Sequence, residues 1–223
     1  MLLLEQAVLR AQQEVVRPSH GSSEQAFAIH KPVLDQGVPQ VAYVAHDLEP
    51  GAFFVYFPLV DEPYYFVVVI RAVGPEVDVS TVYFEAAVHV SLVVTSEVLL
   101  PDTITQQLGI IPTMARAKGA PIQSSKREAP FTLWQFEPHH HILGDIEYKL
   151  NKLVADIMPR SANIVTFSDQ ADATTHTYIR IIYKGYASQM WGWSLLPTTV
   201  QQLALLNIGV DLDLYASEPE VPQ

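Results

Sequence analysis

Three adjacent histidines, His139 to His141, are the residues whose type and spacing most clearly suggest chemistry. His141 and Asp145 would lie one turn apart on a helix. Imidazole nitrogens and carboxylate oxygens are both zinc ligands. His139 and His141 can point to the same side only where the chain is extended. His139, His141 and Asp145 are therefore the candidate metal ligands of this sequence.

A zinc or nickel site here would need a further ligand from elsewhere in the chain, because zinc is held by three or four protein ligands. His89 and His176 are the candidates for that position. The alternative interpretation is a solvated entry to a helix, in which the histidines bind nothing. We predict no metal and no cofactor. A metal-binding protein or metal-dependent enzyme that uses the cluster His139–His141 is the alternative.

Tryptophans are candidates for a small-molecule site, since aromatic side chains often line ligand pockets. The sequence contains Trp134, Trp191 and Trp193. The same rings can instead fill the core between a sheet and its helices, which is the more common use of such large side chains. We include Trp134 and Trp193 among the candidate binding residues and leave both interpretations open.

The segment 114–130 is the only locally basic part of the chain, and its basic residues are Arg116, Lys118, Lys126 and Arg127. It could bind an anion or an acidic partner, for which Arg116 and Lys118 are the candidate binding residues. Its Gly, Ser and Pro content also fits an exposed loop whose charges only keep it solvated. The composition of the segment does not choose between these interpretations.

Two acidic side chains, Asp169 and Asp172, resemble a carboxylate pair, although aspartate also favours turns for backbone reasons. The sequence contains no glycine-rich dinucleotide or phosphate loop, no HExxH zinc motif and no GxSxG nucleophile elbow. We therefore assign no catalytic residue, and the sequence favours a binding protein over an enzyme.

The composition argues against several classes of partner. The chain has 223 residues and a net charge of −11, with 24 acidic and 13 basic side chains. Nucleic-acid surfaces need clustered Lys and Arg, and anionic membranes attract the same residues, so we expect neither partner. The absence of cysteine excludes disulfides and thiolate ligands. Without signal-peptide features or long apolar runs, we expect a soluble, cytoplasmic protein.

Residues 1–87 are expected to form a helix followed by an antiparallel meander. Apolar spacing predicts a helix over residues 1–16, and the run at 26–30 could be an edge strand. Short connections between later strand-like runs favour antiparallel pairing. Those runs, rich in Val, Tyr and Phe, cover residues 41–46, 52–57 and 64–71. The long run 79–94 is either one bent strand or two strands in line, with the break near 85–87.

Residues 88–217 are expected to form an α+β domain, with helices packed on one face of a mostly antiparallel sheet, as in ferredoxin-like folds. The expected strands cover residues 88–94, 131–136, 163–168, 176–184 and 210–215. The expected helices cover residues 101–108, 142–157 and 195–208, and their stops are Gly109, Pro159 and Gly209. Residues 218–223 form a tail. The two parts of the chain could share one sheet.

The second part resembles a family of bacterial proteins, the domain of unknown function numbered 4279. The resemblance rests on an alternating strand followed by PDTITQQLGIIPTMARAKG, on Trp134, on a long helix that ends at Pro159, and on WGWSLLPTTVQQLALLNIGVDLDLY. It covers about residues 88–215 and implies a compact α+β domain of bacterial type. It implies no catalytic residue, because the family brings no established activity. Residues 1–87 resemble no family that we recognise.

Together these observations predict an acidic, non-enzymatic binding or protein-interaction module. Strands rich in Val and Tyr present apolar faces and open edges that need cover. We therefore expect a protein partner or a homodimer, and the sequence does not specify a small-molecule ligand.

Overall fold

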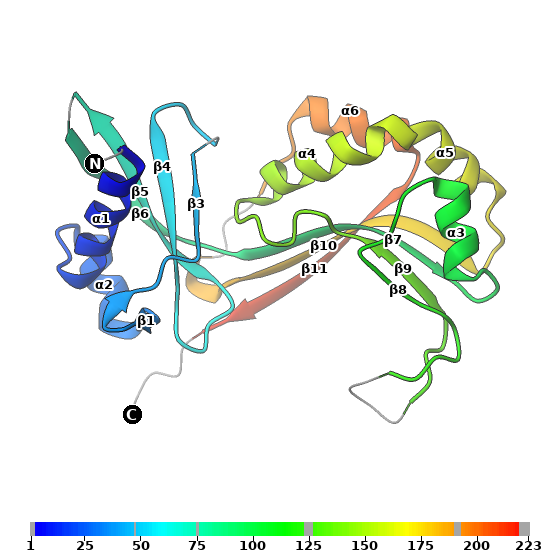
Figure 1. Cartoon of the computed structure of the whole chain (residues 1–223), viewed down its shortest axis with the longest axis horizontal. Coiled ribbons are helices and arrows are strands. Elements are labelled where there is room, and N and C mark those ends of the chain that lie inside the picture. Colours follow the sequence, from blue (N-terminus) through cyan, green and yellow to red (C-terminus); the bar gives the residue numbers. More distant parts are fainter. Residues whose placement is uncertain (1–2, 47, 75, 123–126, 190–192, 219–223) are drawn as a thin grey trace.

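The computed structural model describes residues 3–46, 48–74, 76–122, 127–189 and 193–218. It contains a four-stranded sheet and a five-stranded sheet, besides a two-stranded hairpin. Each of the two larger sheets carries helices on one face (Figure 1). The expected α+β class with mostly antiparallel sheets is confirmed.

The four-stranded antiparallel sheet contains β3 (Tyr43–Ala45), β4 (Ala52–Pro58), β5 (Tyr65–Val73) and β6 (Glu76–Glu85), in that order. This arrangement confirms the expected meander. Two helices cover one of its faces, namely α1 (Leu3–Val16) and α2 (Gly21–Ile29). The hairpin, β1 (Leu34–Asp35) with β2 (Val38–Pro39), connects α2 to this sheet.

The expected edge strand at 26–30 is wrong, because these residues belong largely to α2. Ser23 and Ala26 are three residues apart and both buried, which is helical spacing. Contact of Ala26 with the core beneath α1 therefore outweighs the strand-like composition of a short run. His30 follows as the C-terminal cap of α2, and its backbone amide donates to the Ala26 carbonyl.

Strand β7 (Ala87–Ser96) continues β6 in line, with Ala86 between them, but belongs to the five-stranded sheet. The interpretation of two strands in line is therefore confirmed. The two parts do not share a sheet, since β6 pairs with β5, whereas β7 pairs with strands of the C-terminal part. Glu85, at the end of β6, consequently lies where the two sheets meet.

The five-stranded sheet has the order β11-β10-β7-β9-β8. Its other strands are β8 (Met114–Arg116), β9 (Thr132–Phe136), β10 (Thr175–Tyr186) and β11 (Gly209–Ser217). All its pairs are antiparallel except β10 with β11, which are parallel and need the crossover through α6. The expected ferredoxin-like topology is not confirmed by this order.

Four helices lie on one face of this sheet in Figure 1: α3 (Pro101–Leu108), α4 (Ile146–Ile157), α5 (Ser161–Gln170) and α6 (Pro197–Leu206). The predicted alternation of β7 is confirmed, because Val88, Val90, Leu92 and Val94 are all buried in the core beneath the helices. Gly109 follows α3 with φ of 66°, the left-handed conformation expected of a helix stop.

The predicted strand at 163–168 is wrong, since these residues form part of α5. Ile164 and Phe167 are buried three residues apart, so packing against the core outweighs the strand propensity of Ile, Val and Thr. Asn163 also joins this helix to α3, because its side chain donates to the Leu108 carbonyl at 3.2 Å. Pro159 does end α4, but a short 3₁₀ turn and α5 follow directly.

Two further details at the C-terminal end differ from expectation. Helix α6 ends at Asn207, with φ of 50°, rather than at Gly209, which begins β11. Asparagine tolerates the left-handed conformation almost as well as glycine. Alternation in the strand expected at 210–215 predicts that Val210, Leu212 and Leu214 face inward, but Val210 and Leu214 are 43% and 52% exposed, because β11 is an outer strand. The homodimer expected to cover such strands stays a prediction.

Ile142 lies before α4 and is not part of its buried stripe, which begins at Ile146. The tail at 218–223 falls almost entirely outside the described residues. Within the described residues, no helix combines the length and apolar character that a membrane crossing requires.

Candidate functional site

The candidate metal ligands do not converge. His139 Nε2 lies 2.7 Å from Asp156 Oδ2 on α4, and the rings of His140 and His141 contact each other edge to face. Asp145 caps α4, because its side chain accepts from the Tyr148 amide at 2.7 Å. Among the described residues, no three His, Asp or Glu side chains are placed to hold a metal ion together.

The distant histidines are also placed elsewhere. His89 Nδ1 lies 2.9 Å from Glu137 Oε1, and His176 lies on β10 opposite Thr95 of β7. Neither histidine joins His139 and His141 in a group of three possible ligands among the described residues, so the described geometry gives the metal interpretation no support.

The three tryptophans have different environments. Trp134 is fully buried beneath α3, and its Nε1 donates to Thr105 Oγ1 at 3.0 Å. Its place is therefore in the core. Trp193 is 41% exposed and lines a cleft. Trp191 lies outside the described residues.

Arg116 and Lys118 of the basic segment have separate environments, and their role in anion binding stays a prediction. Lys118 Nζ pairs with Glu97 at 3.1 Å, and both side chains are largely exposed. Arg116 lies on β8, and its Nε is buried without a described hydrogen-bond partner. Neither residue lines the cleft that contains Trp193. Lys126 is outside the described residues.

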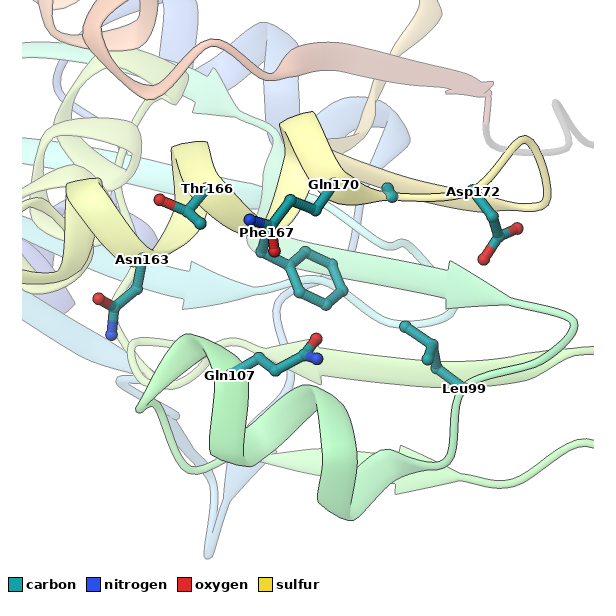
Figure 2. A pocket seen from close by; sticks show the side chains of 8 residues that line it. Leu99, Gln107, Asn163, Thr166, Phe167, Gln170 and Asp172 are labelled. Atoms are coloured by element: carbon teal, nitrogen blue, oxygen red, sulfur yellow. The ribbon is translucent and has the colours of Figure 1, made fainter.

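A pocket of about 340 Å³ lies between α3 and α5 (Figure 2). In Figure 2, Gln170 lies above the ring of Phe167 and Gln107 lies below it. Asp172 also lines this pocket. Both of its carboxylate oxygens accept hydrogen bonds within the turn before β10, from the Thr174 amide and hydroxyl and from the Thr175 hydroxyl. Asp169 is engaged with Asn207, so the suspected carboxylate pair does not form. This pocket offers amide groups but no free ionisable side chain among its described lining.

A site lined by several carboxylates and tyrosine hydroxyls lies where the two sheets meet. Two pockets of about 470 and 410 Å³ share four lining residues, and we call them together the junction cleft. The shared residues are Tyr83, Glu85, Asp145 and Glu147. The first pocket adds Leu48, Glu49, Phe54, Tyr56 and Tyr148, and the second adds Phe84, Ile146, Tyr183, Trp193, Ser194 and Leu196.

Local structure explains how these side chains reach the cleft. Tyr83 and Glu85 are two residues apart on β6, so they point to the same face of that strand. Tyr148 lies over the loop that enters α4, where a Cβ on Gly144 would come within 2.6 Å of its ring. Gly144 has φ of 152°, a conformation that other residues rarely adopt. This glycine therefore allows the tyrosine to form a wall of the cleft.

Most acidic groups in the cleft already have structural partners. Glu49 accepts two hydrogen bonds of 2.7 Å from Arg71, and Asp145 caps α4. Glu147 accepts from the Thr199 hydroxyl and from Asn151, which joins α4 to the start of α6. Glu85 differs from these three carboxylates, because within the described part of the chain it forms no ion pair, caps no helix and connects no two helices, and its hydrogen bonds come from Tyr83 and the Ala86 amide.

The surroundings of Glu85 disfavour its charge. Burial raises the pKa of the Glu85 carboxyl to about 7, and the charge of Asp145 adds to this effect. Hydrogen bonds from Tyr83 and from the Ala86 amide act in the opposite direction on this pKa. The carboxyl therefore changes its protonation near neutral pH, which is the behaviour of a group at a binding or catalytic site.

Tyr56 forms the buried floor of the cleft. It is 0% exposed, and its hydroxyl has no hydrogen-bond partner among the described residues. Burial raises the pKa of this hydroxyl, and the charges of Glu85, Tyr83 and Asp145 raise it further, so these groups lie near one another. A buried hydroxyl without a partner is uncommon in a folded protein, and it leaves an acceptor at the floor of the cleft.

No Lys, Arg or His occurs among the described residues that line the cleft. Two cations contact residues of the lining from outside it: Arg71 Nη2 lies 2.7 Å from the Glu49 carboxylate, and Lys152 Nζ lies 4.6 Å from the centroid of the Tyr148 ring. The cleft therefore combines negative charge with aromatic walls, an arrangement that attracts cations.

Sequence reasoning identified Trp193 as a candidate pocket-lining residue and Asp145 as a candidate metal ligand, and it missed Glu85 and Tyr56. One signal for Glu85 was present, because it follows Tyr83 at strand spacing and falls at the expected break between two strands. The sequence gives no comparable indication for Tyr56, because it is one of several aromatic residues in the strand-like run 52–57.

Residues 86–217 match the family described as Domain of unknown function (DUF4279). This match covers more than half of the chain and leaves the N-terminal part unassigned. No significant match was found among curated proteins or among solved structures.

Proposed function

The chain belongs to the DUF4279 family, whose function is unknown. We propose that it is a binding module for an organic ammonium ion. The ligand occupies the junction cleft, with its charged nitrogen beside Glu85 and its apolar part against the aromatic walls. The observation that carries the proposal is the position of Glu85, held next to Asp145 in a cleft whose described lining contains no basic side chain.

Electrostatics supports a cationic ligand. Two nearby carboxylates repel each other when both are ionised, and a cation between them removes that repulsion. The net charge of −11 adds a long-range attraction for positive ligands. An anionic ligand would be repelled by the same groups.

The walls of the cleft support an organic cation rather than a bare metal ion. Phe54, Tyr183 and Trp193 offer apolar and aromatic surface, and ammonium groups bind favourably over aromatic faces. The unpartnered hydroxyl of Tyr56 can accept a hydrogen bond from an N–H donor. A primary ammonium has three such donors, which suits a carboxylate and a hydroxyl together.

The proposal is tested by calorimetric titration of the full chain at pH 8 with benzylammonium, and with benzyl alcohol as the uncharged ligand of the same shape. We expect saturable binding of benzylammonium. Benzyl alcohol should bind at least about ten-fold more weakly, because it lacks the charge that the carboxylates recognise.

The matched variants are Glu85→Gln and Glu97→Gln, which remove the same charge at different places. Glu97 is exposed, pairs with Lys118 and does not line the cleft. Glu85→Gln should weaken benzylammonium binding about ten-fold or more, as expected for loss of a charged hydrogen-bond partner. Glu97→Gln should leave it nearly unchanged. Equal binding of the alcohol, an unaffected Glu85→Gln variant, or no ammonium binding would each overturn the proposal.

A further inference from the structure

A further pocket, of about 230 Å³, lies on the other face of β6, between α2 and the end of β10. His30 and Phe84 line it, together with Tyr186. Among the described lining residues it shares only Phe84 with the junction cleft. We call it the cage pocket, because aromatic rings surround a buried histidine there.

The cage is formed by rings from three separate elements. The His30 ring lies with its centroid 4.6 Å from that of Phe84, 5.0 Å from that of Tyr186 and 5.8 Å from that of Tyr64. All three contacts are edge to face. Because Tyr64 directly precedes β5, and Phe84 and Tyr186 lie at the ends of β6 and β10, the fold itself builds the cage.

His30 is buried, with 3% of its surface exposed, and neither ring nitrogen has a hydrogen-bond partner among the described residues. A neutral imidazole carries one N–H donor and one acceptor nitrogen. Leaving both unpaired in an apolar environment is unfavourable. A phenylalanine at this position would pack against the same rings without burying unpaired polar atoms. Packing alone therefore does not explain the two nitrogens of His30.

The charge of the pocket differs from that of the junction cleft. Burial lowers the pKa of His30, against the opposing effect of the Glu62 charge, so the ring is held neutral. The other polar residues of the described lining carry only hydroxyl or amide groups, and they are Ser22, Gln25, Ser188 and Gln189. The pocket therefore presents donors and acceptors without a net charge.

We propose that the cage pocket binds a small, uncharged nitrogen heteroaromatic ligand. The ligand ring packs against Phe84 and Tyr186, and a ring N–H and a ring nitrogen of the ligand pair with the imidazole of His30 and a neighbouring glutamine. The volume of about 230 Å³ is enough for a ligand of one or two fused rings. This site is independent of ammonium binding, since its charge and nearly all of its lining are different.

The proposal is tested on the full chain at pH 7.5 with benzimidazole, which has both a ring donor and a ring acceptor. Indole has the same shape and the donor but lacks the acceptor. We expect saturable benzimidazole binding by ligand-observed NMR. Indole should bind at least about five-fold more weakly, because it leaves a buried hydrogen-bond donor of the pocket without an acceptor and so lowers the binding affinity. The ring nitrogen resonances of His30 should shift on addition of benzimidazole.

Three variants separate the site from general effects. His30→Phe keeps the aromatic cage but removes both nitrogens, and it should weaken benzimidazole binding about ten-fold. Ser22→Trp, at an exposed position of α2 that lines the pocket, should obstruct entry without disturbing the cage. Ala28→Trp adds the same bulk at an exposed position of α2 outside the lining and should leave binding unchanged.

The obstructing variant keeps the test decisive if His30→Phe fails to fold. Loss of binding in Ser22→Trp but not in Ala28→Trp supports the site. Absence of saturable benzimidazole binding, equal binding of indole, or binding that Ser22→Trp leaves unchanged overturns it.

Discussion

Glu85 and Asp145 line the same cleft, although Glu85 ends a strand of the four-stranded sheet and Asp145 begins a helix that covers the five-stranded one. The charge of Asp145 contributes to the raised pKa of Glu85, which shows that the two groups interact electrostatically. Asp145 is held in place by its capping bond to Tyr148. The charge that this arrangement disfavours is therefore that of Glu85. Its replacement gives the clearest tests of how the pair affects stability and binding.

The first prediction concerns stability as a function of pH. Burial and Asp145 raise the pKa of Glu85 from 4.5 to about 7. Between these values the folded state holds a proton that the unfolded state has lost. The free energy of unfolding should therefore fall as the pH rises from 4.5 to 7, by about 2 kcal/mol for a partly buried group.

Glu85→Gln should remove this dependence and make the protein more stable than the wild type at pH 8. Urea unfolding at several pH values between 4 and 8 measures the effect, with Glu97→Gln as the control that keeps the wild-type slope. A Glu85→Gln variant with the same pH slope as the wild type would show that Glu85 is not the responsible group.

The second prediction separates binding from stability at Tyr56. Its buried hydroxyl has no described partner, so Tyr56→Phe should leave the free energy of unfolding unchanged or raise it by up to about 1 kcal/mol. The same change should weaken benzylammonium binding several-fold, because an acceptor in the cleft is lost. Tyr215→Phe, at a residue 52% exposed on β11, is the control that should change neither quantity. A clear loss of stability in Tyr56→Phe would indicate that the hydroxyl is already satisfied within the protein.

The third prediction concerns the connection between α1 and α2. The carboxylate of Glu14 is fully buried and accepts hydrogen bonds from the amides of Ser19 and His20 at 2.9 and 3.0 Å, and from the Ser19 hydroxyl. Burial alone would raise the pKa of Glu14, but these hydrogen bonds outweigh it and lower the pKa to about 2. The stabilisation is therefore complete above pH 4.5 and is lost as the pH falls towards 2.

Glu14→Gln should accordingly destabilise the protein by about 2 kcal/mol at pH 7, the usual cost of losing charged hydrogen bonds. The difference from the wild type should shrink at pH 3. Glu24→Gln, at an exposed position of α2, should change stability by no more than about 0.5 kcal/mol. Thermal unfolding followed by circular dichroism at both pH values makes the comparison. A variant as stable as the wild type at pH 7 would contradict the role given to Glu14.

Local patterns predicted those elements whose signal lies within a few residues. The alternation of β7, the buried spacing of α3 and the left-handed stop at Gly109 are of this kind, because strand pleat, helix period and backbone conformation are local properties. The prediction failed for residues 163–168, where strand-forming residues became a helix. There the buried spacing of Ile164 and Phe167 against the core decided the outcome.

The sequence by itself determined the acidic balance, the absence of thiol chemistry and the family of the C-terminal part. It also placed a bend or a break near Glu85, and the structure decided that two strands meet there. Only the tertiary structure decided that Trp134 is core while Trp193 lines a cleft, and that Glu85 lies beside Asp145. The physical reason is that burial and charge proximity depend on which distant elements pack together. The junction cleft and the cage pocket both exist because β6 runs into β7 where the two sheets meet, with Glu85 and Tyr83 on one face of β6 and Phe84 on the other.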